Sequence, residues 1–179
     1  IDRGRKDGIK NGMNVISGSG LVGIVVDVGA NYAKVRTIIN DSNRVSAMVS
    51  TTKDNFTISG SLESMNKDKV ITFNELRDEN NKVKVGDPVV TSYVSDQYQQ
   101  GILIGYIASI EENSNNLTKS GTITPVVDFE HIENVLVILQ VKDTGDDKSS
   151  ADSESSDDTQ KDTQKESSTQ KSTESDSQQ

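Results

Sequence analysis

The first 143 residues alternate short apolar runs with clusters of Gly, Asn, Asp and Ser, which is typical of many short β-strands. The clearest alternation is in Ile102–Ile110, where Ile102, Ile104 and Ile110 share one face. A period of two indicates a strand with one buried face. Similar runs predict about ten strands, at 13–17, 21–28, 33–39, 45–49, 56–62, 69–73, 88–91, 102–110, 121–127 and 135–141.

Two segments stand apart from this alternation. Val135–Leu139 is apolar on both faces, which predicts a central strand covered on both sides. Residues 128–134 favour one or two helical turns, with Asp128 as N-cap and Glu130 near the positive end of the helix dipole. Crossover helices for a parallel sheet are missing, so the sequence predicts an all-β fold of closed antiparallel barrels or a sandwich. Glycines such as Gly105 suit barrel corners and bulges.

The composition changes abruptly near the carboxyl end. From Thr144 to Gln179 the only aliphatic residue is Ala151, and this stretch holds ten acidic and four basic residues, which account for −6 of the net charge of −9. Such a segment has too little apolar surface to offset the entropy cost of ordering. We predict a disordered, acidic, Ser/Thr/Gln-rich tail over 143–179, leaving about 140 residues to fold as one domain or two small ones.

Several classes of protein are excluded by what the chain lacks. Without a basic block, nucleic-acid binding is not expected. Without cysteine, there are no disulfides and no thiolate metal sites. No stretch approaches the roughly 20 apolar residues of a membrane span, and no signal peptide opens the chain. Because the sequence begins at Ile1 without Met, we expect a fragment whose targeting or anchoring segment lies upstream.

Catalysis by a Ser–His–Asp centre would have to use His131, the single histidine. Asp128 lies three residues earlier, but the chain has no Gly-x-Ser-x-Gly elbow, and Ser92 reads as the end of a strand. We therefore predict a surface or turn role for His131 and no catalytic site.

Paired carboxylates and metal ligands give no stronger signal. Neighbouring acids in a strand point to opposite faces, so we interpret the adjacent pairs as solvated loop charge: Glu111-Glu112, Asp78-Glu79 and Asp157-Asp158. Asp143–Asp147 lacks the ligand spacing of a calcium loop. Gly18–Gly23 runs on into a strand, whereas a dinucleotide-binding loop leads into a helix. The sequence predicts neither a metal nor a cofactor.

Three segments carry a family pattern. The first runs from Gly4 to Ile16 (GRKDGIKNGMNVI) and is followed by Gly20–Gly23 (GLVG). The second is Val85–Ser92 (VGDPVVTS), followed by Gly101–Gly105 (GILIG), and the third joins Pro125–Phe129 (PVVDF) to Val135–Val137 (VLV). In this order and spacing, over residues 4–137, they resemble the MreC family of rod shape-determining proteins.

The resemblance implies a fold of two small six-stranded antiparallel β-barrels. We expect residues 1–44, with strands near 123–142, to form the first barrel and residues 45–122 to form the second. It also implies the extracytoplasmic part of a protein of the cytoplasmic membrane, tethered by a missing amino-terminal helix and coiled coil.

The implied function is a non-enzymatic scaffold of the cell-elongation machinery. Its implied partners are itself, as a homo-oligomer, a class B penicillin-binding protein, MreD and other proteins of the elongation complex. On the surface we single out Tyr93, Tyr98 and Ile102 as an interface, with Tyr98 equally able to cover a barrel end. Two alternatives stay open: a hydrolase on protease-like barrels and a cell-wall glycan-binding module.

Overall fold

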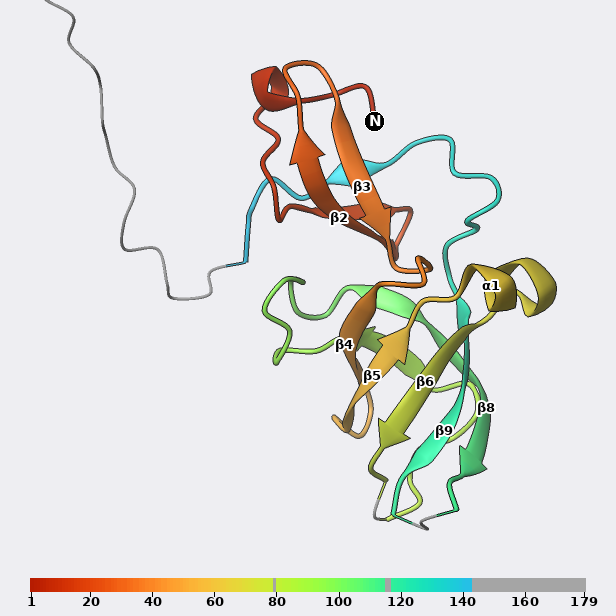
Figure 1. Ribbon diagram of the computed structural model, residues 1–179. Helices are drawn as coiled ribbons and strands as arrows, with labels where there is room; N and C mark the ends of the chain where they lie inside the picture. Colours follow the sequence, from red (N-terminus) through yellow and green to blue (C-terminus); the bar gives the residue numbers. More distant parts are fainter. Residues whose placement is uncertain (79, 115–116, 143–179) are drawn as a thin grey trace, which may run out of the picture. The chain divides into compact units, whose positions relative to one another are not determined.

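The centre of the fold is a closed barrel of six antiparallel strands (Figure 1). The computed structural model describes residues 1–78, 80–114 and 117–142. The barrel strands are β4 (Arg44–Val49), β5 (Asn55–Ser59), β6 (Ile71–Leu76), β7 (Pro88–Thr91), β8 (Leu103–Glu112) and β9 (Lys119–Pro125). Pairing runs β4–β5–β6–β9–β8–β7, and β7 pairs back onto β4. Closure leaves this sheet without a free edge.

Alternate residues of these strands fill the barrel. Phe56 and Phe73 meet in the interior with ring centroids 5.0 Å apart. Around them lie fully buried aliphatic side chains, among them Ile58, Ile71, Leu76, Ile104, Ile107 and Ile123. The period-two pattern of the sequence therefore places one β-branched or aromatic face of each strand in a dry core.

Two glycines let β8 and β9 approach closely. A Cβ atom on Gly105 would lie 2.1 Å from the carbonyl oxygen of Thr124, and one on Gly121 would lie 2.0 Å from that of Ser109. The pairing register shifts between Ile107 and Ser109, so the strands bend where these glycines lie. The predicted role of Gly105 in the barrel is confirmed.

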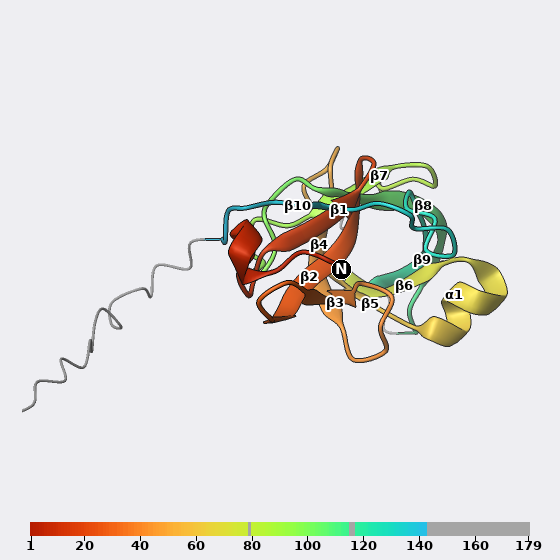
Figure 2. The ribbon, with the colours of Figure 1, turned by 90° about the horizontal axis from the view of Figure 1, so that it is seen from above.

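Beside the barrel lies a second group of strands, here called the sheet lobe. It consists of β1 (Asn14–Ser17), β2 (Gly20–Val28), β3 (Ala33–Thr37) and β10 (Leu136–Val137), in the order β10–β1–β2–β3, all antiparallel. A 3₁₀ turn, Arg5–Asp7, precedes them. The lobe has its own core, built from Ile9, Met13, Val15, Val22, Val25, Ala33 and Val127. A single parallel bridge, Gly20 with Leu103, joins β2 to β8 of the barrel. Figure 2 looks onto the sheet lobe, with the strands of the barrel behind it.

The amino-terminal residues extend this lobe. The nitrogen of Ile1 donates to the carbonyl of Ala33 at 2.9 Å, and the Ala33 nitrogen donates to the carbonyl of Ile1 at 3.1 Å. Ile1 thus lies beside β3, on the side of the lobe opposite the β1–β2 pairing.

The helix forms elsewhere than predicted. Residues 128–134 contain no helix, because the Asp128 carboxylate accepts the backbone N–H of Glu130 in a local turn and the chain then crosses back to the sheet lobe. Instead α1 (Leu62–Asp68) follows β5, with the Ser61 hydroxyl accepting the N–H of Ser64 at its start. Only Met65 of this helix is buried, so it has no apolar periodicity that the sequence could reveal.

The interpretation of Val135–Leu139 as a central strand is wrong. β10 pairs with β1 alone and ends the strand order, so it is an edge strand. Leu136 and Leu139 are each 65% exposed. Val135 and Val137 pack against the core of the sheet lobe, so only the outer face, with Leu136 and Leu139, is not explained by burial within the described part of the chain.

The all-β prediction is confirmed, as are the ten strands within the described residues, with ends shifted by a few positions. One closed six-stranded barrel is present, and the predicted second barrel and the predicted domain boundaries stay predictions. The predicted tail, 143–179, lies outside the described residues. None of the described helices has the length and apolar character needed to cross a membrane.

Candidate docking surface

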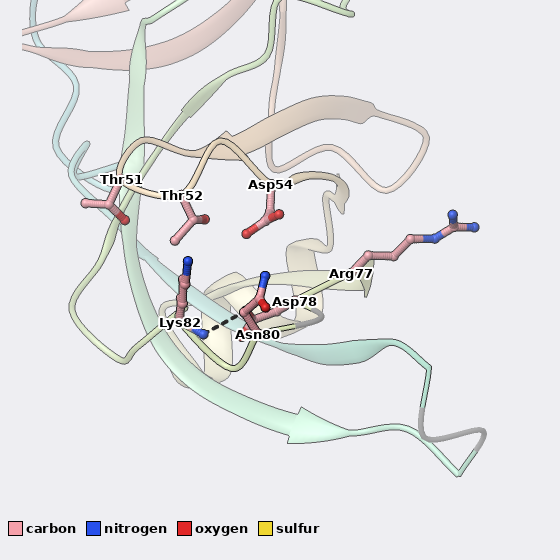
Figure 3. Close-up of a pocket in the computed structure, with 7 residues that line it drawn as sticks. All are labelled: Thr51, Thr52, Asp54, Arg77, Asp78, Asn80 and Lys82. Carbon is pink, nitrogen blue, oxygen red and sulfur yellow. Dashed lines mark hydrogen bonds between the residues drawn. The ribbon is translucent and has the colours of Figure 1, made fainter.

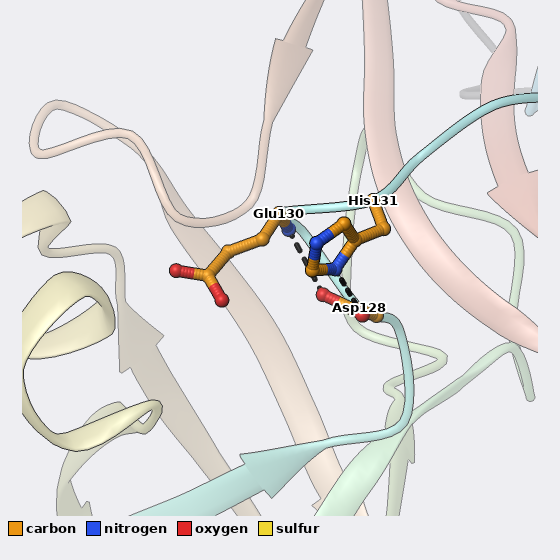
Figure 4. Close-up of side chains that lie close together, drawn as sticks. All are labelled: Asp128, Glu130 and His131. Carbon is orange, nitrogen blue, oxygen red and sulfur yellow. Dashed lines mark hydrogen bonds and ion pairs between the residues drawn. The ribbon is translucent and has the colours of Figure 1, made fainter.

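His131 lies on the surface in a local ion pair. Its Nδ1 is 2.8 Å from an Asp128 carboxylate oxygen, and the two side chains are 77% and 64% exposed. Figure 4 shows the imidazole turned toward this carboxylate. Among the described residues no serine hydroxyl shares a hydrogen bond with His131, so the structure does not assemble the Ser–His–Asp arrangement there. The predicted absence of a catalytic site stays a prediction.

The pair makes a testable electrostatic prediction. The hydrogen bond that His131 donates to the Asp128 carboxylate and, next, the negative charge of that carboxylate raise the pKa of His131 above its ordinary value. The stabilisation from this pair is therefore fully present below the unfolded-state pKa of His131 and is lost as the pH rises through the folded-state pKa. We expect an NMR titration of the imidazole to give a pKa above about 6.5. In the Asp128→Asn variant the pKa of His131 should fall back toward its ordinary value. An equal pKa in the variant and the unmodified chain would contradict the pairing.

The same turn holds the three exposed side chains of Asp128, Glu130 and His131, with one ligand atom from each within 4.8 Å of the others. The Glu130 carboxylate is also ion-paired with Lys69 at the end of α1. The Lys69–Glu130 pair links this turn to the end of α1. The predicted absence of a metal stays a prediction.

Asp78 corrects the interpretation of the acidic pairs. Its carboxylate is 2% exposed and accepts the Lys119 ammonium at 2.9 Å, together with the backbone N–H groups of Lys82 and Val83. Burial acts to raise the pKa of Asp78, but these hydrogen bonds and the Lys119 charge outweigh it and lower the pKa. Asp78 therefore organises the β6–β7 connection and is not solvated loop charge. Glu111 and Glu112 are exposed, as predicted, but they form the end of β8 and not a loop.

Next to this carboxylate is a polar cavity of about 510 Å³ (Figure 3). Its lining mixes both charges with hydroxyl and amide groups: Thr51, Thr52, Asp54, Arg77, Asp78, Asn80 and Lys82. Figure 3 shows these side chains coming from two connections, β4–β5 above and β6–β7 below. They close one end of the barrel with polar groups rather than with a hydrophobic recognition surface.

The three residues singled out for an interface separate in the structure. Tyr98 is 1% exposed, and its hydroxyl accepts the Asn43 side-chain amide at 3.1 Å, so it covers the end of the barrel. Ile102 packs partly against the barrel core. Tyr93 alone is largely exposed, with its hydroxyl near the Asn55 amide. Of the three, Tyr93 is the residue available to a partner.

Tyr93 belongs to the β7–β8 loop, residues 92–102, which lies against the C-terminal segment, residues 135–142. The Lys142 ammonium donates to the carbonyls of Tyr93 and Ser95, and the Gln99 side-chain amide donates to the carbonyl of Gln140 at 3.3 Å. In Figure 1 this loop, in green, lies next to the blue end of the C-terminal segment. Residues from the barrel and from the sheet lobe are thereby brought side by side.

Together these two segments present what we call the apolar band. The band consists of the exposed side chains Tyr93 and Val94 on the loop and Leu136, Leu139 and Val141 on the C-terminal segment. Isolated exposed apolar residues are ordinary on a protein surface, whereas contiguous apolar patches are typical of interaction sites. The band is therefore a candidate docking surface because its two segments are hydrogen-bonded side by side.

One end of the band borders a groove of about 440 Å³. The groove runs between Ile1–Arg3 and the C-terminal segment. Its apolar lining comes from Ile1, Ile9, Val135, Leu136, Val137 and Leu139, and its charged lining from Asp2, Arg3, Asp7 and Glu133. The unpaired edge of β10 faces this part of the surface, so backbone as well as side chains are accessible to a partner.

These features define a small all-β module, a closed barrel with an appended sheet and an exposed apolar band. Residues 1–139 match the model of the rod shape-determining protein MreC, barrel core. The chain belongs to the MreC family.

Known relatives agree with this assignment. The cell shape-determining protein MreC of Listeria monocytogenes is 33% identical over 158 residues, which cover 86% of this chain and 52% of that protein. A solved structure of MreC from Listeria monocytogenes has a TM-score of 0.66 at 34% identity and covers 76% of this chain and 65% of its own. A solved complex of the penicillin-binding protein PBP2 with MreC from Helicobacter pylori has a TM-score of 0.53 at 14% identity. The match covers 69% of this chain and 74% of that one. The chain spans about half the length of the curated relatives it matches.

Proposed function

We propose that this chain is the extracytoplasmic part of a non-enzymatic scaffold that holds peptidoglycan synthases in place and so maintains rod cell shape. The observation that supports the proposal is the exposed apolar band on a chain whose residues 1–139 match the MreC family. A scaffold needs an accessible apolar surface and no reaction centre, and the band supplies that surface across two adjoining segments.

The partner we propose for the band is a class B penicillin-binding protein. A fold relative in complex with such a protein supports this choice. The apolar side chains of the band and the open β10 edge suit a partner that offers an apolar, partly extended segment. Because these synthases work outside the cytoplasmic membrane, we place the chain on the extracytoplasmic side. We also propose self-association, contact with MreD, and a membrane tether through an upstream helix and coiled coil.

We further infer that the sheet lobe is the counterpart of a second small barrel, with residues 1–44 and about 123–142 in one unit and 45–122 in the other. The hydrogen bonds of Ile1 with Ala33 support this, because they continue the sheet from β3 toward β10. The remaining gap is the groove beside the C-terminal segment. Cross-strand NOEs between residues 1–3 and 135–139 would establish closure, and their absence in solution would count against a second barrel.

The docking proposal predicts a loss of synthase binding when the band is made acidic. In Leu136→Asp and Leu139→Asp, a charge replaces an exposed apolar side chain of the band where it borders the groove, and we expect affinity to fall about 30-fold or more. The measurement is surface plasmon resonance against the soluble extracytoplasmic domain of the class B penicillin-binding protein of the same organism.

A matched control is Val85→Asp, which makes the same kind of change at another residue that is 65% exposed, in the β6–β7 connection. This variant should bind like the unmodified chain. If the unmodified chain does not bind the synthase at all, the scaffold proposal falls. If all three variants bind alike, the docking surface is elsewhere.

A further inference from the structure

Asn14, the first residue of β1, is 1% exposed. A buried amide must place both its N–H groups and its oxygen in hydrogen bonds, because an unpaired polar group away from water is costly. In a small strand that otherwise packs valine and isoleucine, such a side chain calls for a specific role.

The Asn14 side chain reaches out of the sheet lobe to the β7–β8 loop. Its Nδ2 donates to the carbonyl of Gln97 at 3.0 Å, and its Oδ1 accepts the backbone N–H of Gln99 at 2.6 Å. A longer contact of 3.5 Å links Nδ2 to the carbonyl of Gly12. Both strong bonds are made to main-chain atoms of the loop more than eighty residues away, so they fix where the loop backbone lies.

The Asn14 main chain holds the other half of the band. Its carbonyl oxygen accepts the backbone N–H of Ile138 at 2.8 Å. Ile138 lies between Leu136 and Leu139 in the C-terminal segment. One residue therefore contacts, through its side chain and its backbone, both of the segments that carry the apolar band.

Other contacts tie the loop to the barrel rather than to the sheet lobe: the Thr91 hydroxyl donates to the carbonyl of Gln99 at 2.5 Å, and the backbone N–H of Ser92 donates to the carbonyl of Ser46 at 2.9 Å. Within the described residues, three bonds join the loop to the C-terminal segment: those of Lys142 to the Tyr93 carbonyl and of Gln99 to the Gln140 carbonyl lie where water competes, and that of Lys142 to the Ser95 carbonyl is partly buried. All three come from long, flexible side chains, whereas Asn14 is fully buried. The Ser95 hydroxyl accepts the N–H of Tyr98, which shapes the loop internally without placing it. Asn43 holds Tyr98 at the barrel end and not near the C-terminal segment.

We propose that Asn14 is a positioning residue for partner docking: it keeps the two halves of the apolar band in one fixed arrangement, ready to bind. This inference rests on the proposed function and adds to it the element that aligns the surface. A surface already in its bound geometry avoids the ordering cost of association. If the loop occupied that geometry only a tenth of the time, affinity would fall about ten-fold.

Two substitutions test this. Asn14→Ala removes every side-chain bond to the loop, and we expect about ten-fold weaker binding to the soluble class B penicillin-binding protein domain. Hydrogen exchange should accelerate at 93–99 and 138–142, while amides of the barrel strands stay protected. Ile71→Val is the matched control, since it lowers stability from the barrel core without touching the band.

Asn14→Asp separates positioning from general loss of structure. An ionised carboxylate would face the carbonyl of Gln97, whereas a protonated one can donate to that oxygen and still accept from Gln99. Binding by this variant should be weak at pH 8 and recover toward pH 5, compared at each pH with the unmodified chain. Asn14→Ala should show no such recovery.

The outcomes are distinct. Full affinity in Asn14→Ala, or a loss no greater than that of an equally destabilised Ile71→Val, overturns the positioning role and leaves the scaffold proposal intact. Absence of synthase binding by the unmodified chain overturns both. Weakened binding with local loosening and recovery of Asn14→Asp at low pH supports the role of Asn14.

Discussion

Gly121→Val should strongly destabilise the barrel. The added Cβ would lie 2.0 Å from the backbone oxygen of Ser109 and 2.8 Å from the ring of Phe73, so β8 and β9 would have to separate. Those strands share the longest pairing of the barrel, and both also pair with other barrel strands. We expect a destabilisation of about 4 kcal/mol or more, read from the urea midpoint by circular dichroism.

Thr124→Val is the control for that experiment. Thr124 lies in the same strand, its side chain is exposed, and valine keeps the branched shape at Cβ. This change should alter stability by about 0.5 kcal/mol or less. Similar urea midpoints for the two variants would show that β8 and β9 do not need their close approach at Gly121.

Asp78→Ala should cost about 2 to 3 kcal/mol of folding free energy. The change leaves the Lys119 ammonium, which is 14% exposed, without its carboxylate, and it removes the acceptor of two backbone N–H groups. Asp68→Ala is the comparison, since Asp68 is exposed at the end of α1 and should change stability little. Equal losses in both variants would mean that the buried pair is not stabilising.

The effect of Asp78 should also depend on pH with a defined sign. A pKa that is lower in the folded than in the unfolded chain contributes stability above the unfolded value, and this is lost as the pH falls through the folded value. The difference between the unmodified chain and Asp78→Ala should therefore be constant from neutral pH down to about pH 4 and shrink below it.

The barrel could be predicted from sequence because its strands obey a local rule. In β5 the alternating Phe56 and Ile58 are buried as the pattern requires. In Ile102–Ile110 the alternation holds only in part, because Ile107 is buried like Ile104 and Tyr106 is 44% exposed. Which strand pairs with which could not be read from periodicity. β9, for example, pairs with both β6 and β8 and so helps to close the barrel, although its residues straddle the predicted domain boundary at 122–123.

The candidate site was only partly visible in the sequence. Tyr93 and Tyr98 look alike as exposed loop aromatics, yet the bond of Tyr98 to Asn43 places one in the core and leaves the other outside. The signal for the C-terminal half of the band was present but was misinterpreted. Because Val135–Leu139 is apolar on both faces, it was interpreted as a strand buried on both sides. In the structure it contains the edge strand β10, which exposes one face.

Asn14 gave no sequence signal of its own. One amide within an apolar strand resembles a solvent-facing residue of an alternating pattern, and its partners are 83 and 85 residues distant. Tertiary hydrogen bonds of this kind depend on how two lobes meet, which local patterns do not encode.

Both ends of the described chain belong to the sheet lobe, since Ile1 is bonded to Ala33 and β10 is paired with β1. In chain order the barrel strands β4–β9 are inserted between β3 and β10, which both belong to the sheet lobe. Tension applied between the two ends is thus borne first by the strands of the sheet lobe, and the barrel is spared until they part. Under such a load the proposed docking band would be pulled apart before the inserted barrel unravels, and the module could still re-form from that barrel.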